Sequence, residues 1–277
     1  MTHLRLDRVA FAWAAEEPLF VDVTAHLEPR AYALVGANGA GKTTLLELLA
    51  GERTPSQGRI TRSGAGAAAF CRQRVEHMDD AIATFASRCD RPANALRGQL
   101  LLRTADLARW PTLSPGERKR WQVAAALATE PDVLLLDEPT NHLDERAREL
   151  VLAALRRFAG LLVLVSHDRA VLDQVTSMTL RLHQRGLTVW PGRFSLAKRE
   201  WEQARVAAEA AHRDAQIRVR ALAQQVDQAR RAQEAASRNV SAGRRMKSRH
   251  DSDARGPLAN TKAAWAAGKA GRVTAAA

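Results

Sequence analysis

The segment from Gly36 to Thr44 has the residue types and spacing of a loop that holds a phosphate chain. It reads Gly-Ala-Asn-Gly-Ala-Gly-Lys-Thr-Thr, follows a short apolar stretch and opens an apolar helical pattern. In this context the backbone amides of Asn38 to Thr43 can point at a β-phosphate, and Lys42 can place its charge between the β- and γ-phosphates. The pattern predicts a P-loop (Walker A motif) for a nucleoside triphosphate, formed by Gly36, Asn38, Gly39, Ala40, Gly41, Lys42, Thr43 and Thr44.

Two adjacent carboxylates follow an apolar segment in the middle of the chain. Residues 133–136 predict a buried strand, and Asp137 and Glu138 come directly after it. Asp137 stands where coordination of Mg²⁺ is expected, together with the Thr43 hydroxyl. Glu138 stands where it can orient or deprotonate an attacking water. Alone, the pair could be solvated acids at a strand end, but beside a P-loop the catalytic interpretation is favoured.

Predicted helices alternate with short apolar strands around these groups. Strands are expected within residues 3–35 and at 161–165, and a hairpin at 57–70 that turns at Gly64 to Gly66; helices are expected at 77–111, 115–129 and 144–158. Asp144 is a good N-cap for the last of these helices. The alternation predicts a mostly parallel sheet that helices cover on both faces.

The composition changes after Pro191. Residues 195–236 contain no glycine or proline and are rich in Ala, Gln, Arg and Glu, which predicts one helix of about 60 Å. Residues 237–261 are polar and basic, and we expect the helix to break there, at Gly243, Gly256 and Pro257. Residues 201–277 carry 15 Lys and Arg against 7 Asp and Glu. This excess predicts either a tail that binds a polyanion or a solvated basic helix.

The remaining composition excludes several classes. Cys71 and Cys89 do not have the spacing of metal ligands, so reduced thiols are expected. There is no run of 18 apolar residues, and the N-terminus lacks the apolar segment of a signal peptide. We therefore expect a cytoplasmic protein without a membrane span.

The motifs together resemble the signature set of ATP-binding cassette (ABC) ATPases. The set comprises the P-loop, Leu-Ser-Pro-Gly-Glu at 113–117, Leu-Leu-Leu-Asp-Glu-Pro-Thr at 134–140, and His167. The resemblance implies an α/β P-loop NTPase fold, in which a parallel core sheet is joined by an antiparallel β subdomain and a helical subdomain, and hydrolysis of ATP with Mg²⁺. It also implies that two cassettes face each other, so that Ser114 and Gly116 of one contact the γ-phosphate on the other. Pro115 replaces the usual glycine and removes one amide donor.

The same resemblance assigns roles to three more residues. Gln73 would sense Mg²⁺ and the γ-phosphate and, with Thr43 and Asp137, complete the metal site. His167 would contact the γ-phosphate as a second catalytic residue beside Glu138, and Trp13 would stack on adenine. Without the resemblance, Gln73 could be a surface residue, His167 a structural one and Trp13 part of the core.

Two longer motifs resemble the ABC-F branch of this family. They are Asp-Glu-Pro-Thr-Asn-His-Leu-Asp at 137–144 and Ser-His-Asp-Arg at 166–169. ABC-F proteins lack transmembrane domains, act on the ribosome as translation factors or antibiotic-resistance proteins, and normally join two cassettes by a long helical linker. The resemblance implies an ATP-binding domain at 1–194 and a helical, basic linker at 195–277. The linker tip at 238–262 would contact rRNA and tRNA phosphates. The second cassette would come from homodimerisation or from a missing half.

Two other functions remain open. A soluble ATPase subunit of an ABC transporter is compatible with the cassette alone. An ATPase with a coiled coil that acts on DNA would need a sustained heptad seam. The large apolar residues in 200–236 are few, which disfavours that third function: Trp201, Val206, Ile217, Val219, Leu222 and Val226.

Overall fold

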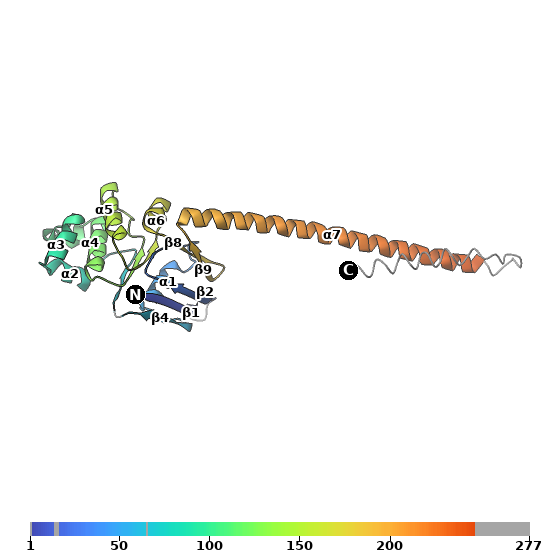
Figure 1. The fold of residues 1–277 in the computed structure, drawn as a ribbon, viewed down its shortest axis with the longest axis horizontal. Helices are drawn as coiled ribbons and strands as arrows, with labels where there is room; N and C mark the ends of the chain where they lie inside the picture. The colour runs from blue at the N-terminus through green and yellow to red at the C-terminus, as the bar shows by residue number, and fades with distance from the viewer. Residues whose placement is uncertain (1, 14–16, 65, 247–277) are drawn as a thin grey trace. The chain divides into compact units, whose positions relative to one another are not determined.

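The computed structural model describes residues 2–13, 17–64 and 66–246 of the 277-residue chain. Packing divides the chain after Arg205. The first unit contains two sheets and six α-helices among its described residues (Figure 1). The second unit contains the greater part of one long helix, α7 (Phe194–Met246).

The core sheet has six strands in the order β5-β6-β7-β3-β8-β9. Its strands are β3 (Ala31–Gly36), β5 (Ala68–Cys71), β6 (Val133–Asp137), β7 (Leu161–Val165), β8 (Met178–His183) and β9 (Gly186–Pro191). All of its pairs are parallel except β8 with β9. Every residue of β6 and β7 is buried, as expected for strands that helices cover on both faces. The predicted mostly parallel sheet is confirmed.

The second sheet is antiparallel, in the order β2-β1-β4, with β1 (His3–Phe11), β2 (Phe20–Leu27) and β4 (Gln57–Ser63). The predicted hairpin at 57–70 is wrong, because β4 pairs with β1 whereas β5 pairs with β6 in the other sheet. A distant residue, Asp132, stabilises the connection between β4 and β5. Its carboxylate accepts hydrogen bonds from the Gly66 amide and from the Thr2 hydroxyl. Local turn signals cannot reveal such a long-range partner.

The helices lie between these strands in the sequence. They are α1 (Lys42–Ala50), α2 (Asp80–Ser87), α3 (Arg91–Gln99), the 3-10 helix η1 (Thr104–Thr112), α4 (Pro115–Ala128), α5 (Glu145–Arg156) and α6 (Arg169–Val175). Asp144 caps α5 as predicted, since its carboxylate accepts from the Ala147 amide at 2.7 Å. In the helical part, Phe85 packs edge-on against Trp121 with ring centres 5.9 Å apart.

The long helix α7 begins on the first unit. Phe194 and Ala197 are buried, and the Trp201 ring packs against Phe194 and under the guanidinium of Arg181. Asp173 of α6 accepts hydrogen bonds from the backbone amide and the hydroxyl of Ser195. These contacts fix the first turns of the helix to the first unit.

Further along, α7 is exposed at every residue from Val206 to Arg238 except the half-buried Ala210. The break expected at Gly243 is wrong, because the helix continues to Met246. One glycine costs a helix only about 1 kcal/mol, which flanking residues can offset. Gly256 and Pro257 lie outside the described residues. Within the part of the chain that the structure describes, no helix has the length and apolarity to cross a membrane.

Candidate nucleotide-binding and catalytic site

The loop between β3 and α1 needs its glycines. Gly39 and Gly41 adopt φ angles of +78° and +93°, which side chains disfavour. A Cβ atom on Gly36 would lie 2.9 Å from the Leu182 carbonyl oxygen. The first turn of α1 has neither a side-chain cap nor an acidic residue. Its amides and the positive end of the helix dipole are therefore available to an anion.

The Lys42 side chain folds back over this loop. Its Nζ donates to the carbonyl oxygens of Gly36 and Ala37, each at 3.1 Å. The ammonium group is thus held above the same loop whose amides would contact a phosphate. A lysine held in this position can bind a polyphosphate, whereas an isolated surface lysine would extend into solvent.

Thr43 and Asp137 are brought together from positions 94 residues apart. The Thr43 hydroxyl donates to the Asp137 Oδ2 at 2.6 Å, and Asp137 is buried. A hydroxyl and a carboxylate are the oxygen ligands that Mg²⁺ prefers, with phosphate and water supplying the others. The pair therefore fits a magnesium ion. No group of three or more His, Cys, Asp or Glu residues among those described could hold a metal by itself.

Glu138 and His167 meet at the ends of β6 and β7. Glu138 is 2% exposed with φ +50°, and its Oε2 accepts from the His167 amide at 3.2 Å. Its Oε1 accepts no hydrogen bond and lies 3.6 Å from the His167 Nε2. Burial raises the pKa of Glu138, although the His167 amide and ring oppose that effect. A buried carboxylate oxygen that accepts no hydrogen bond from the protein can accept one from an ordered water.

Ser114 is the N-cap residue of α4. Ser114 and Glu117 form a reciprocal capping box on α4, in which the Glu117 Oε2 accepts from the Ser114 amide at 2.8 Å. Pro115 occupies the first turn, where a missing amide breaks no helical hydrogen bond. No hydrogen bond joins Ser114 or Gly116 to the described loop of residues 36–44. The structure therefore does not bring these two residues into the site of their own chain.

Gly116 packs tightly against the loop after β6. A Cβ atom there would lie 2.5 Å from the His142 carbonyl oxygen. We expect Gly116→Ala to lower the free energy of unfolding by about 1–3 kcal/mol and to slow ATP hydrolysis, because two backbone segments must separate. Thermal unfolding and phosphate release measure both effects. Gly98→Ala is the control, since nothing lies within 4 Å of its added atom; equal losses in the two variants would contradict this prediction.

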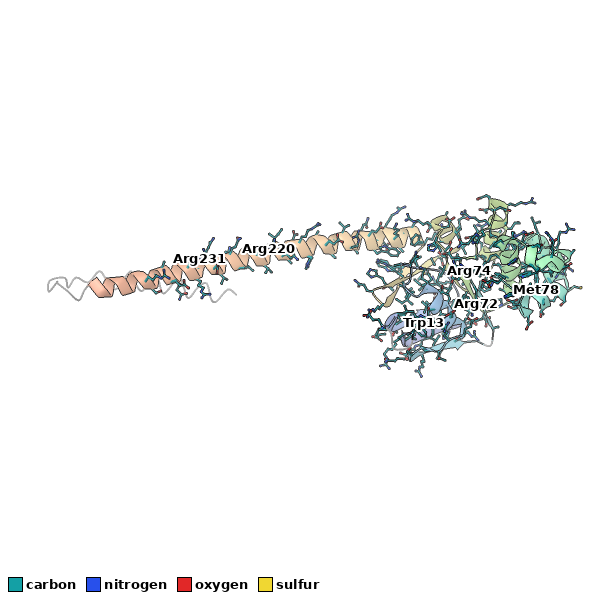
Figure 2. All side chains as sticks on the ribbon, turned by 180° about the vertical axis from the view of Figure 1, so that it is seen from behind. Trp13, Arg72, Arg74, Met78, Arg220 and Arg231 are labelled. Carbon is teal, nitrogen blue, oxygen red and sulfur yellow. The ribbon has the colours of Figure 1, made fainter. Side chains whose placement is uncertain are left out.

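Gln73 and Trp13 are less constrained. Gln73 follows β5 and is exposed, and no hydrogen bond of its side chain is present among the described residues. Trp13 is 41% exposed, so the core interpretation is wrong (Figure 2). Its ring meets Phe11 edge-on at 5.4 Å, and the Arg53 guanidinium lies 4.3 Å from its centre. The structure leaves its contact with adenine untested.

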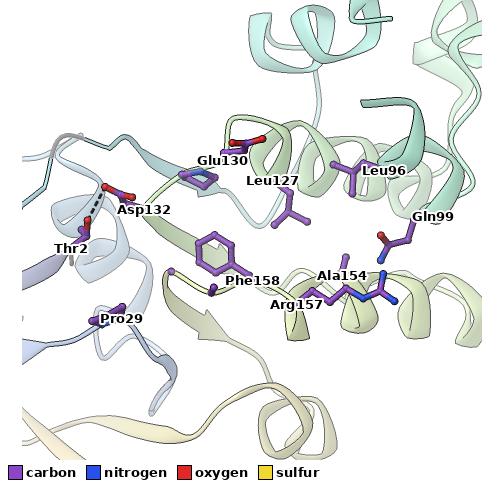
Figure 3. A pocket seen from close by; sticks show the side chains of 13 residues that line it. Thr2, Pro29, Leu96, Gln99, Leu127, Glu130, Asp132, Ala154, Arg157 and Phe158 are labelled. Carbon is purple, nitrogen blue, oxygen red and sulfur yellow. Dashed lines mark hydrogen bonds between the residues drawn. The ribbon is translucent and has the colours of Figure 1, made fainter. Parts of the chain in front are cut away.

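A cavity of about 770 Å³ lies away from these groups (Figure 3). Its lining includes Asp132 and Gly160, which precede β6 and β7, whereas Glu138 and His167 follow those strands. Phe158 and Leu127 contribute its apolar wall. The carboxyl ends of parallel strands meet at one edge of a sheet, so this cavity belongs to the opposite edge.

Lys119 on α4 is 3% exposed, and no motif in the sequence predicted a role for it. A signal was present, because Lys119 follows Gly116 by three residues and precedes Val123 by four, on the buried face of the helix. Arg72, directly before Gln73, was also missed. It gives no local signal, since its partners Glu47 and Glu52 are distant in sequence.

Comparisons with known proteins show which proteins this chain is similar to. A family model described as ABC transporter matches residues 22–141. The ribosome protection protein VmlR of Bacillus subtilis (strain 168) is 33% identical, over 58% of this chain and 28% of that protein. ABC transporter F family member 2 of Dictyostelium discoideum is 30% identical, over 68% and 34%. The chain thus spans about a third of the length of these curated relatives.

A solved structure of a bacterial Atm1-family ABC exporter with ATP bound has a TM-score of 0.62. It is 23% identical and covers 76% of this chain and 42% of that one, so it supports the fold alone. Fold, loop chemistry and sequence relatives together define an ATPase of the ATP-binding cassette type. Within that class the chain is similar to ABC-F proteins, as the Dictyostelium relative shows by its name.

Proposed function

We propose that this ABC-F ATPase couples the hydrolysis of Mg-ATP to ribosome binding in the cytoplasm, as a translation factor or a ribosome-protection protein. The observation that carries the proposal is α7, a helix of 53 residues that continues directly from an ABC-F cassette and is exposed over nearly all of residues 206–238. The relative named for ribosome protection adds support.

In this proposal each residue has a defined task. Lys42 and the amides of the P-loop bind the β- and γ-phosphates, and Trp13 stacks on adenine. Thr43, Asp137 and Gln73 hold Mg²⁺, which neutralises phosphate charge. The Oε1 of Glu138, which accepts no hydrogen bond from the described residues, orients the attacking water and accepts its proton.

In this proposal each ATP is bound between two facing cassettes, so one cassette alone does not complete the site. His167 contacts the γ-phosphate within the chain, whereas Ser114 and Gly116 serve the γ-phosphate bound to the facing cassette. The absence of a hydrogen bond between these two residues and their own P-loop supports that division of labour. A second copy of the chain or a missing half would supply the facing cassette.

We assign residues 1–194 to the ATP-binding domain and 195–277 to the linker. Residues 206–238 carry six arginines and four acidic residues, and the side chains of Arg220 and Arg231 project from α7 (Figure 2). Residues 239–277 carry eight Lys and Arg against two Asp. Most of the tip at 238–262 lies outside the described residues. The concentration of positive charge beyond Arg238 favours phosphate binding there.

Sedimentation with ribosomes tests this function. The Glu138→Gln protein should pellet with ribosomes when ATP is present, and should pellet less as salt rises, because phosphate contacts release counterions. The matched control adds Lys42→Ala to the same variant, which should remove the ATP dependence. Retained ATP binding without co-sedimentation would contradict ribosome coupling and leave the transporter-subunit function.

A further inference from the structure

The ammonium group of Lys119 is buried between α4 and the loop that carries Gln73. Its Nζ donates to the Arg72 carbonyl oxygen and to the Gln122 Oε1, the latter at 3.0 Å. Burying a charged amine is costly unless its donors are satisfied. Desolvation lowers the pKa of Lys119 to about 8, while the nearby Asp137 and Glu138 carboxylates oppose that effect. Burial of the Lys119 ammonium group therefore costs free energy, and its hydrogen bond to the Arg72 carbonyl oxygen offsets part of that cost.

That partner, Arg72, is held at both ends. Lys119 binds its backbone carbonyl, and its guanidinium pairs with the Glu47 Oε1 at 3.2 Å and with Glu52. Glu47 is buried in α1, the helix that begins at the P-loop, and it also binds Arg53. Arg72 therefore connects the helix that follows Ser114 to the helix that follows the P-loop.

Gln73 is the residue directly after Arg72. Its own side chain is exposed, and it lines a cavity of about 280 Å³ together with Lys119, Pro115, Asn141 and other residues. The start of the loop is thus fixed while the amide of Gln73 is left for a ligand. Arg72 is anchored beside Gln73, while no hydrogen bond among the described residues engages the Gln73 side chain. That side chain is therefore positioned and still available to bind a ligand.

We propose that Lys119 is a positioning residue that sets Gln73 for its contact with Mg²⁺ by clamping Arg72 between α4 and α1. This inference rests on the metal role proposed for Gln73. It predicts that a shift of α4, the helix that follows Ser114, changes Mg²⁺ binding at the site of the same cassette. A lysine that only stabilised the fold would affect unfolding without a specific effect on Mg²⁺.

The test compares ATP affinity with and without Mg²⁺ in the 277-residue chain, using a fluorescent ATP analogue. Lys119→Met should leave affinity in EDTA unchanged and should reduce the gain in affinity from Mg²⁺ by roughly tenfold, because Gln73 loses its placement. Arg120→Met is the matched control. It lies next on α4, but its guanidinium donates to the Leu100 and Leu101 carbonyls, away from Gln73.

A double-mutant cycle separates positioning from general damage. Lys119→Met should add little to Gln73→Ala, because both remove one contact. Additive losses, or an unchanged Mg²⁺ gain in Lys119→Met, would overturn the positioning role. No effect of Gln73→Ala would remove the metal role of Gln73 and this inference with it. Lys119→Gln retains a donor for the Arg72 carbonyl oxygen and serves if the methionine variant does not fold; its Mg²⁺ gain should lie between that of the unaltered chain and that of Gln73→Ala, and a full gain would overturn the positioning role.

Discussion

Replacing Lys42 with alanine is expected to weaken ATP binding by about 100-fold or more. In the structure the ammonium group is held above the loop by the Gly36 and Ala37 carbonyls. Each hydrogen bond to a charged group contributes about 1.5–3 kcal/mol, and the lysine would contact two phosphates. Equilibrium binding of a fluorescent ATP analogue measures the loss.

A control must separate the phosphate contact from a general loss of positive charge. Lys198→Ala removes a lysine whose Nζ lies 3.5 Å from the Glu202 carboxylate on α7. Its affinity for ATP should match that of the unaltered chain. Nanomolar-to-micromolar affinity retained in Lys42→Ala would refute the proposed phosphate contact.

The Glu138→Gln substitution is expected to leave ATP binding intact and to slow turnover by roughly a thousandfold. Glutamine has the same shape, and its oxygen can still accept from the His167 amide as the Glu138 Oε2 does. It cannot accept a proton from the attacking water. Phosphate release and ATP affinity, measured on the same preparation, distinguish turnover from binding.

Two results would test this role further. Glu145→Gln removes an exposed acid in the first turn of α5 and should hydrolyse ATP normally. Because burial raises the pKa of Glu138, the rate should rise with pH through a value above the usual glutamate value of about 4.3. The glutamine variant should lack this acidic limb. Undiminished hydrolysis in Glu138→Gln would exclude Glu138 as the base.

The amino-acid sequence alone determined the groups whose requirements are local. A P-loop needs glycines at particular positions, and Gly39 and Gly41 do adopt positive φ angles. The apolar segment at 161–165 forms β7 as predicted, and Asp144 caps α5 through its own neighbours. Such features depend on residues a few positions apart, so a pattern can predict them.

The tertiary structure decided which distant segments meet. The sheet that each of β4 and β5 joins depends on β1 and β6, which no turn signal between them encodes. The same holds for Lys119, whose burial depends on the distant Arg72 carbonyl. Side-chain partners of this kind are fixed by the packing of whole helices against the sheet. A motif therefore predicts Glu138 as the catalytic carboxylate, whereas the contacts of Lys119 and Arg72 beside Gln73 could be found only in the folded chain.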